Sequence, residues 1–251
     1  MLDEAREGTV VVLTLDQPAR RNALGMAMRE RLVAAFERVE GDASVRAVVV
    51  TGRGGVFCAG GDVSGMDAAD LAAGRERFRV THRLVRLMAH GSKPLVAAVE
   101  GWCVGAGLSL ACLCDTVVAG EGARFMAGFG KLGLVADLGL LHTLPGRVGQ
   151  GRARQMLLYA EAMAAERAEA IGLVDAVVPG GAALGAAMER ARSFADGAPL
   201  PVALTRQYLA GGLDAALDWE REMQSALFLT ADHAEGKAAF LGKRAPRFVG
   251  R

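Results

Sequence analysis

Two turns rich in small residues are the features of this chain whose types and spacing could do chemistry. The first is Phe57–Asp62 (FCAGGD) and the second is Gly101–Gly107 (GWCVGAG). Each follows an apolar run that is typical of a buried strand, Ala47–Thr51 before the first turn and Leu95–Val99 before the second. Glycine and alanine let a backbone approach a ligand closely, and a helix that starts after such a turn leaves amide N–H groups unpaired. Two such turns facing one another would each give one N–H to the same oxygen. That is a main-chain oxyanion hole, which stabilises an enolate.

The composition excludes several classes of function. The chain has 251 residues, of which 52% are hydrophobic, so it can bury a full core. Its formal net charge of +1 gives no bulk attraction to nucleic acid or to a membrane surface. No apolar run approaches the roughly 20 residues that span a bilayer, and the charged segment Met1–Glu7 is unlike a signal peptide. We therefore expect a cytoplasmic protein with no nucleic-acid or membrane partner.

The cysteines predict no metal site. Cys58, Cys103, Cys112 and Cys114 lie among apolar or small residues, as reduced core cysteines do. The pair Cys112 and Cys114 is too closely spaced for a zinc knuckle, and no second pair follows. No glycine pattern of a dinucleotide site follows a strand in the proper spacing. We expect no metal, nicotinamide or flavin.

Short strands and helices alternate over most of the chain, which predicts an α/β fold with sites at the carboxyl ends of strands. The expected strands are 10–15, 47–51, 95–99, 115–119, 123–126 and 173–178. The expected helices begin near residue 22 and cover 68–89, 107–114, 138–160 (broken by Pro145) and 164–171. Their arginines between Arg75 and Arg86 fit a solvated helix face, and His82, His90 and His233 are expected at the surface.

The character of the chain changes after residue 183. Several alanine-rich amphipathic helices and no convincing strand follow. A boundary near Asp196–Gly197 would divide a core with the active site, 1–196, from a helical oligomerisation region, 197–251. These last helices are too few to bury their apolar faces alone, so they should pack on the core or on another subunit.

Together with other segments, the two turns resemble the crotonase (enoyl-CoA hydratase/isomerase) superfamily over nearly the whole chain. The further matching segments are LDQP at 15–18, NAL at 22–24, KPLVAAVEG at 93–101, CD at 114–115, AEAIGLV at 168–174 and EGKAAFLGKR at 235–244. The resemblance implies a spiral of β-β-α turns, a helical C-terminal trimerisation region and a homotrimer or dimer of trimers. It also implies acyl-CoA substrates, with coenzyme A as part of the substrate, and it places the oxyanion donors at the N–H groups of Gly61 and Ala106.

Departures from the family pattern bear on the reaction. Hydratases of this family use two glutamates, whose places are taken here by Ser109 and Phe129, so the addition of water has no obvious base. The segment Leu132–Gly139 resembles the isomerase branches, including 1,2-epoxyphenylacetyl-CoA isomerase, in which the aligned aspartate is the acid/base. The resemblance therefore implies an enoyl-CoA isomerase that uses Asp137. A hydratase that relies on Asp137 alone and a non-catalytic acyl-CoA-binding protein are the alternatives.

Other interpretations of these residues stay open at this point. Asp137 precedes an apolar helical pattern and would also suit a helix N-cap. The segment Gly107–Ala111 is close to the nucleophile elbow of a serine hydrolase, with Ser109, His142 and Asp137 as the triad. That interpretation is weak because Ala111 replaces the last glycine, and because a histidine five residues after the aspartate on one helix has poor geometry.

The remaining site residues are predicted substrate contacts. Asp62 is also suited to hold its turn through local hydrogen bonds, and Leu71 and Phe78 would join Met66 in the acyl pocket. Arg20, Arg21 and Lys243 are candidates for the phosphates of coenzyme A. The family's fold allows Phe240 and Lys243 to come from a neighbouring subunit. The predicted substrate-binding residues are Ala23, Ala59, Asp62, Met66, Ser109, Phe129, Phe240 and Lys243.

Overall fold

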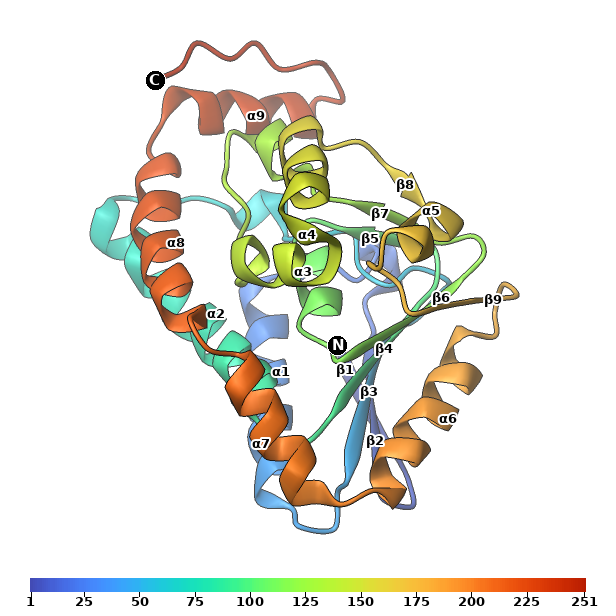
Figure 1. Ribbon diagram of the computed structural model, residues 1–251. Helices are drawn as coiled ribbons and strands as arrows, with labels where there is room; N and C mark the ends of the chain where they lie inside the picture. Colours follow the sequence, from blue (N-terminus) through green and yellow to red (C-terminus); the bar gives the residue numbers. More distant parts are fainter.

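The computed structural model describes residues 1–251 and contains a six-stranded sheet in the order β1-β2-β3-β4-β6-β9 (Figure 1). Only β1 and β2 are antiparallel, and every other neighbouring pair is parallel. The strands are β1 (Leu2–Glu7), β2 (Val10–Leu15), β3 (Ala47–Gly52), β4 (Leu95–Val99), β6 (Thr116–Gly120) and β9 (Ala176–Val178). The prediction of a mixed α/β fold is confirmed.

The sheet is covered on both faces, which explains its continuous apolar strands. Alternate residues of β3 face opposite layers: Val48 and Val50 join the larger core, and Ala47 and Val49 join the smaller one. The larger core contains α1 (Met26–Gly41) and α2 (Leu71–His90), whereas α6 (Ala183–Asp196) closes the smaller core. Figure 1 shows α6 alone on one side of the sheet and α1 and α2 on the other.

A small three-stranded sheet lies at the carboxyl end of the main one. It consists of β5 (Trp102–Val104), β7 (Arg124–Met126) and β8 (Met163–Ala164). The sequence pattern did not indicate β5, because three residues between glycines look like part of a turn. The isolated bridge between Cys58 and Cys103 attaches the first glycine-rich turn to this sheet.

Several predicted boundaries are wrong for local reasons. Helix α1 begins at Met26 and not near Asn22, because Asn22 has a left-handed φ of 57° and its side chain binds three main-chain groups. Strand β1 is a charged, exposed edge strand and so lacks an apolar pattern. The break in α4 (Leu140–Tyr159) is at Gly149, where φ is 75°, and not at Pro145.

The remaining helices lie in several parts of the molecule. They are α3 (Ala106–Cys112), α5 (Ala165–Ala170), α7 (Pro199–Leu209), α8 (Leu213–Leu227) and α9 (Ala231–Leu241), with short 3-10 helices η1 (Pro18–Arg20), η2 (Val63–Gly65) and η3 (Gly128–Leu132). Helices α9 and α7 lie at opposite ends of the molecule (Figure 1). Helix α8 packs closely against α2, since a Cβ on Gly74 would lie 2.8 Å from the side chain of Ser225. The division of the chain near residue 196 stays a prediction.

Two further findings concern membrane-spanning helices and the cysteines. None of the helices combines the length and the apolar character that crossing a membrane requires. All four cysteines are buried and reduced, as the sequence predicts.

Candidate active site

The two glycine-rich turns lie side by side. The N–H of Phe57 donates to the carbonyl of Glu100 at 2.7 Å, and the N–H of Cys58 donates to that of Trp102 at 3.0 Å. The carbonyl of Cys58 accepts from the N–H of Val104 at 2.9 Å. The two segments therefore run parallel and reach their turns at the same place.

The close approach requires glycine at several of these positions. Gly60 has a φ of 108°, and a Cβ on it would lie 3.1 Å from the carbonyl oxygen of Val104. A Cβ on Gly107 would lie 2.6 Å from the carbonyl oxygen of Cys58. Side chains at either position would separate the turns, so the small residues of the sequence pattern have a packing cause.

The amides of Gly61 and Ala106 are unpaired and border one cavity. Ala106 is the first residue of α3, so its N–H has no partner within the helix. Neither N–H donates a hydrogen bond to another group of the protein. Both residues line a cavity of about 110 Å³ that Asp137 also lines. The cavity is thus lined by two residues whose N–H groups are free and by one acidic residue.

Asp137 is the only acidic residue that lines this cavity. It is 6% exposed, and its Oδ1 has no hydrogen-bond partner. Its Oδ2 lies 3.8 Å from Nη2 of Arg29. Burial raises the pKa of Asp137 to about 7, against the lowering effect of the Arg29 charge. The N-cap of α4 is Gly139, with no side-chain cap, so the capping interpretation of Asp137 is wrong.

A buried carboxylate on α8 fixes the backbone next to Asp137. Glu220 accepts hydrogen bonds from the N–H groups of Leu138, at 3.0 Å, and Gly139, at 2.8 Å. Both residues have left-handed φ values, 52° and 72°, and the first is unfavourable for leucine. The hydroxyl of Ser109 donates to the carbonyl of Asp137 at 2.8 Å. The backbone that follows Asp137 is therefore anchored at three main-chain groups.

The sequence did not indicate two arginines near Asp137 or a histidine that contacts Glu220. Arg29 on α1 donates to the carbonyl of Leu24 and, at 2.6 Å, to the hydroxyl of Thr81. Arg77 on α2 lines the cavity. His82 has a ring nitrogen 3.0 Å from Glu220.

The expectation that His82 and His233 lie at the surface is wrong, because each is only 2% exposed. The apolar spacing of Phe78 and Val85 placed the face of α2 that holds His82 inward, and this was the available signal. The ring nitrogens of His233 lie 2.9 Å from the carbonyl oxygens of Leu132 and Met66. His233 thus joins α9 to the wall of the cavity.

The other predicted site residues divide into two groups. Ala59, Met66, Phe129 and Phe240 line the cavity, as does Phe78, whereas Ala23, Asp62, Ser109, Lys243 and Leu71 do not. Asp62 caps η2 by accepting from the N–H of Ser64 at 3.2 Å, and it pairs with Arg20. Their roles as substrate contacts stay predictions.

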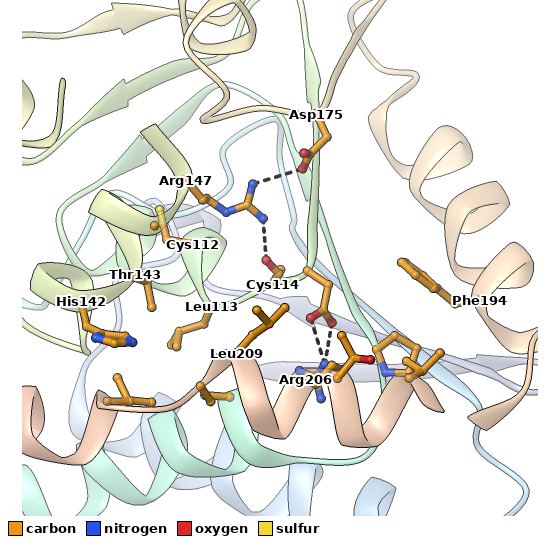
Figure 2. Close-up of a pocket in the computed structure, with 18 of the residues that line it drawn as sticks. Cys112, Leu113, Cys114, His142, Thr143, Arg147, Asp175, Phe194, Arg206 and Leu209 are labelled. Carbon is orange, nitrogen blue, oxygen red and sulfur yellow. Dashed lines mark hydrogen bonds and ion pairs between the residues drawn. The ribbon is translucent and has the colours of Figure 1, made fainter. Parts of the chain in front are cut away.

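The structure gives no support to a serine hydrolase. Ser109 is fully buried, and its hydroxyl donates to main-chain carbonyls. His142 lines a different cavity, of about 770 Å³, shown in Figure 2. The charged groups of that second cavity are paired within the protein: Arg147 with Asp175 at 3.1 Å, and Arg206 with Asp115 at 2.8 Å. No cluster of three or more potential metal ligands occurs in the molecule.

The comparison with protein families decides the assignment, since the family model described as enoyl-CoA hydratase/isomerase matches residues 5–251. The chain belongs to the enoyl-CoA hydratase/isomerase family. Within this family, it is 40% identical over 251 residues to the 2,3-dehydroadipyl-CoA hydratase of Escherichia coli K12, covering 98% of each chain. It is 36% identical to the 1,2-epoxyphenylacetyl-CoA isomerase of the same organism, covering 98% of this chain and 97% of the relative.

Solved structures of the hydratase/isomerase family have the same fold. An enoyl-CoA hydratase from Mycobacterium avium subsp. paratuberculosis K-10 superimposes with a TM-score of 0.89 at 32% identity, covering 99% of this chain and 98% of that one. The crotonase fold and a family activity on acyl-CoA therefore hold for this chain, while its relatives carry the names of both hydratases and isomerases.

Proposed function

We propose that this protein is an enoyl-CoA isomerase that moves a double bond between the 3,4 and 2,3 positions of an acyl-CoA. The observation that carries the proposal is one cavity lined by two residues with free main-chain N–H groups and by a single acidic residue. Isomerisation needs one proton removed at Cα and one delivered at Cγ. One carboxylate between these carbons can do both, because the proton that it takes is the proton that it returns.

The N–H groups of Gly61 and Ala106 would bind the thioester oxygen. Removal of the α-proton gives a dienolate whose negative charge is largely on that oxygen. Donors that are already in place stabilise this charge without reorganisation, and one such donor is typically worth about a hundred- to thousand-fold in rate. Both donors belong to the backbone, and the close packing around Gly60 and Gly107 keeps them in position.

Asp137 would be the base and then the acid. Its pKa of about 7 makes it a stronger base than an ordinary aspartate, while the carboxylate is still populated near neutral pH. Its partner-free Oδ1 is available to a substrate proton. Apolar neighbours such as Phe129 and Leu134 keep water away from the proton that it carries.

A hydratase is the second candidate, favoured by the name of the relative that is 40% identical. A family hydratase would have two glutamates, but Phe129 lines the cavity and Ser109 is buried and hydrogen-bonded to the main chain. Hydration would then depend on Asp137 alone to activate water.

The decisive experiment incubates the purified protein with 3-enoyl- and 2-enoyl-CoA thioesters and identifies the products by mass spectrometry. We expect interconversion of the two isomers with no gain of water. The variant Asp137→Asn should slow the reaction about a hundred- to ten-thousand-fold, since that is the usual contribution of a placed acid/base. Hydrated product, or unchanged isomerisation by Asp137→Asn, would contradict the proposal. Binding without turnover or α-proton exchange would indicate an acyl-CoA-binding protein.

A further inference from the structure

One of the five arginines of α2 forms no ion pair. Four of the five are on the surface and form ion pairs: Arg75 with Glu222, Arg79 with Glu76, Arg83 with Glu37 and Arg86 with Asp214. Arg77 is the exception, because its guanidinium has no carboxylate partner and Arg77 lines the same cavity as Asp137. The expectation of a solvated helix face is therefore correct for four of these arginines and wrong for Arg77.

The position of Arg77 is fixed by its neighbours. Its guanidinium carbon lies 5.5 Å from the ring centroid of Phe228, at a distance at which a cation is attracted to an aromatic face. Phe228 and the adjacent Phe78 also line the cavity, and their rings stack at 6.2 Å. Arg77 is thus held against an aromatic wall with its hydrogen-bond donors unused.

The charges within the cavity do not balance. Arg29, Arg77 and Lys131 line it together with one acidic residue, Asp137, whose nearest cation is Arg29. Desolvation, and after it repulsion from Arg29, lowers the pKa of Arg77. The charged form of Arg77 is therefore less stable in the cavity than it would be in water. A partly buried guanidinium that lacks a partner would be stabilised by an anion.

We propose that the cavity selects acyl-CoA thioesters whose acyl chain ends in a carboxylate, and that Arg77 binds this carboxylate. This inference rests on the proposed function, in which the thioester lies at Gly61 and Ala106 and the reacting carbons lie at Asp137. The planar fork of a guanidinium matches a carboxylate and can donate two parallel hydrogen bonds to it. An uncharged tail would cover Arg77 without giving it a partner, so the same residue disfavours ordinary fatty acyl groups.

The test measures equilibrium binding of saturated acyl-CoAs, which does not require turnover. Adipyl-CoA is compared with hexanoyl-CoA, which has the same chain length and no terminal carboxylate; succinyl-CoA and suberyl-CoA vary the reach. We expect the wild-type protein to bind at least one of the dicarboxylic thioesters about 10- to 100-fold more tightly than hexanoyl-CoA, in the range of a charge-assisted contact. Arg77→Met should abolish or invert this preference.

Matched variants separate the role of Arg77 from a general effect of charge. Arg79→Met removes an exposed arginine two residues away on the same helix and should leave the preference unchanged. Arg77→Lys keeps the charge but loses the planar fork, and should retain a reduced preference for the dicarboxylic thioesters. If Arg77→Met fails to fold, Arg77→Lys replaces it in the test.

Three outcomes would overturn the inference. Wild-type protein that binds hexanoyl-CoA as tightly as every dicarboxylic thioester would exclude it, while leaving the proposed function intact. An equal loss of affinity for both classes in Arg77→Met and Arg77→Lys would give Arg77 a structural role instead. Failure of all these thioesters to bind would contradict this inference and the proposed function together.

Discussion

Opposing influences act on the pKa of the Asp137 carboxyl group. Burial raises its pKa, and the guanidinium of Arg29, at 3.8 Å, lowers it; the net result is a value of about 7. An acid/base residue with a pKa near the working pH is present in both forms, which suits a group that must take and return one proton. The balance also makes the activity sensitive to any change in the neighbouring charges.

The pH dependence of the wild-type enzyme follows from this value. In the proposed reaction the carboxylate of Asp137 removes the α-proton, so kcat/KM for isomerisation should rise with pH and level off above about 7. Below that pH it should fall about tenfold per unit, because the protonated acid cannot act as the base. A pH–rate profile with a 3-enoyl-CoA measures this. A profile that is flat between pH 5 and 8 would exclude Asp137 as the base.

Arg29→Met should move that profile to higher pH. Without the cation, the ionised form of Asp137 loses its nearest stabilising charge, so its pKa rises and less carboxylate is present at neutral pH. Activity at pH 7 should fall, with partial recovery in alkaline buffer. Arg31→Met on the exposed face of the same helix is the control and should leave the midpoint where it is. A midpoint that Arg29→Met does not raise would contradict this account.

Helix α8 holds the backbone next to Asp137 through hydrogen bonds. Its Glu220 accepts the N–H groups of Leu138 and Gly139, and these bonds stabilise a segment with two consecutive left-handed residues. The negative charge of Glu220 also raises the pKa of Asp137. A helix from the carboxyl-terminal region thus sets both the position and the acidity of a residue that lies outside that region.

Glu220→Gln should lower both the stability of the protein and the apparent pKa of Asp137. Its amide has one acceptor oxygen where the carboxylate has two, so a buried N–H loses its partner at a cost of about 1–3 kcal/mol. The midpoint of thermal unfolding should fall by several degrees, about 2–4 °C per kcal/mol for a chain of this size. The midpoint of the pH–rate profile should shift to lower pH, opposite to Arg29→Met.

The control for Glu220 lies on the same helix. Glu222→Gln removes an exposed carboxylate that pairs with Arg75, and such pairs contribute little to stability. It should leave the pH profile unchanged. A profile that Glu220→Gln shifts upward, or does not shift, would show that Glu220 has no electrostatic effect on Asp137.

Elements whose cause is local could be predicted from the sequence. Strands β3 and β4 are continuous apolar runs between turns, and both were recognised within one or two residues. Strand β5 could not be recognised, because its pairing with Cys58 depends on a segment more than forty residues away. The start of α1 was missed because the side chain of Asn22 is held by groups brought close only by folding.

The candidate site was only partly predictable for the same reason. The small residues at the two turns and the aspartate could be recognised as motifs. The contacts of Glu220 with Leu138 and of Arg29 with Asp137 join residues far apart in the sequence. Neither Arg77 nor its unpaired state could be inferred, since five arginines on one helix are usually a solvated face.

The surface of the whole molecule indicates an assembly. On α7, Leu200, Leu204 and Tyr208 recur every four residues and are 73%, 65% and 86% exposed, so they form one apolar stripe. Leu158 and Tyr159 at the end of α4 are also exposed. An exposed apolar stripe like that on α7 is typical of an interface. We propose that it joins copies of this chain in the trimer or dimer of trimers that the family resemblance implies.

Analytical ultracentrifugation tests the assembly. We expect a species of three or six times the 26.1 kDa chain mass. The double variant Leu204→Glu and Tyr208→Glu should shift it toward a smaller species, because buried charges without partners oppose association. Arg190→Glu, on the exposed face of α6, is the control and should leave the size of the assembly unchanged. A wild-type monomer would contradict the proposed trimer, and an unaffected double variant would place the interface elsewhere.

The parallel attachment of the first turn to β5 has a consequence for how this molecule can be re-engineered. The two amides that we propose as oxyanion donors are held by main-chain bonds and by the absence of side chains at Gly60 and Gly107. The part of the cavity wall that Phe78 and Phe228 form takes no part in those main-chain bonds. Libraries that randomise the wall should therefore yield new acyl preferences on an unchanged catalytic frame, while the two glycines tolerate almost no replacement.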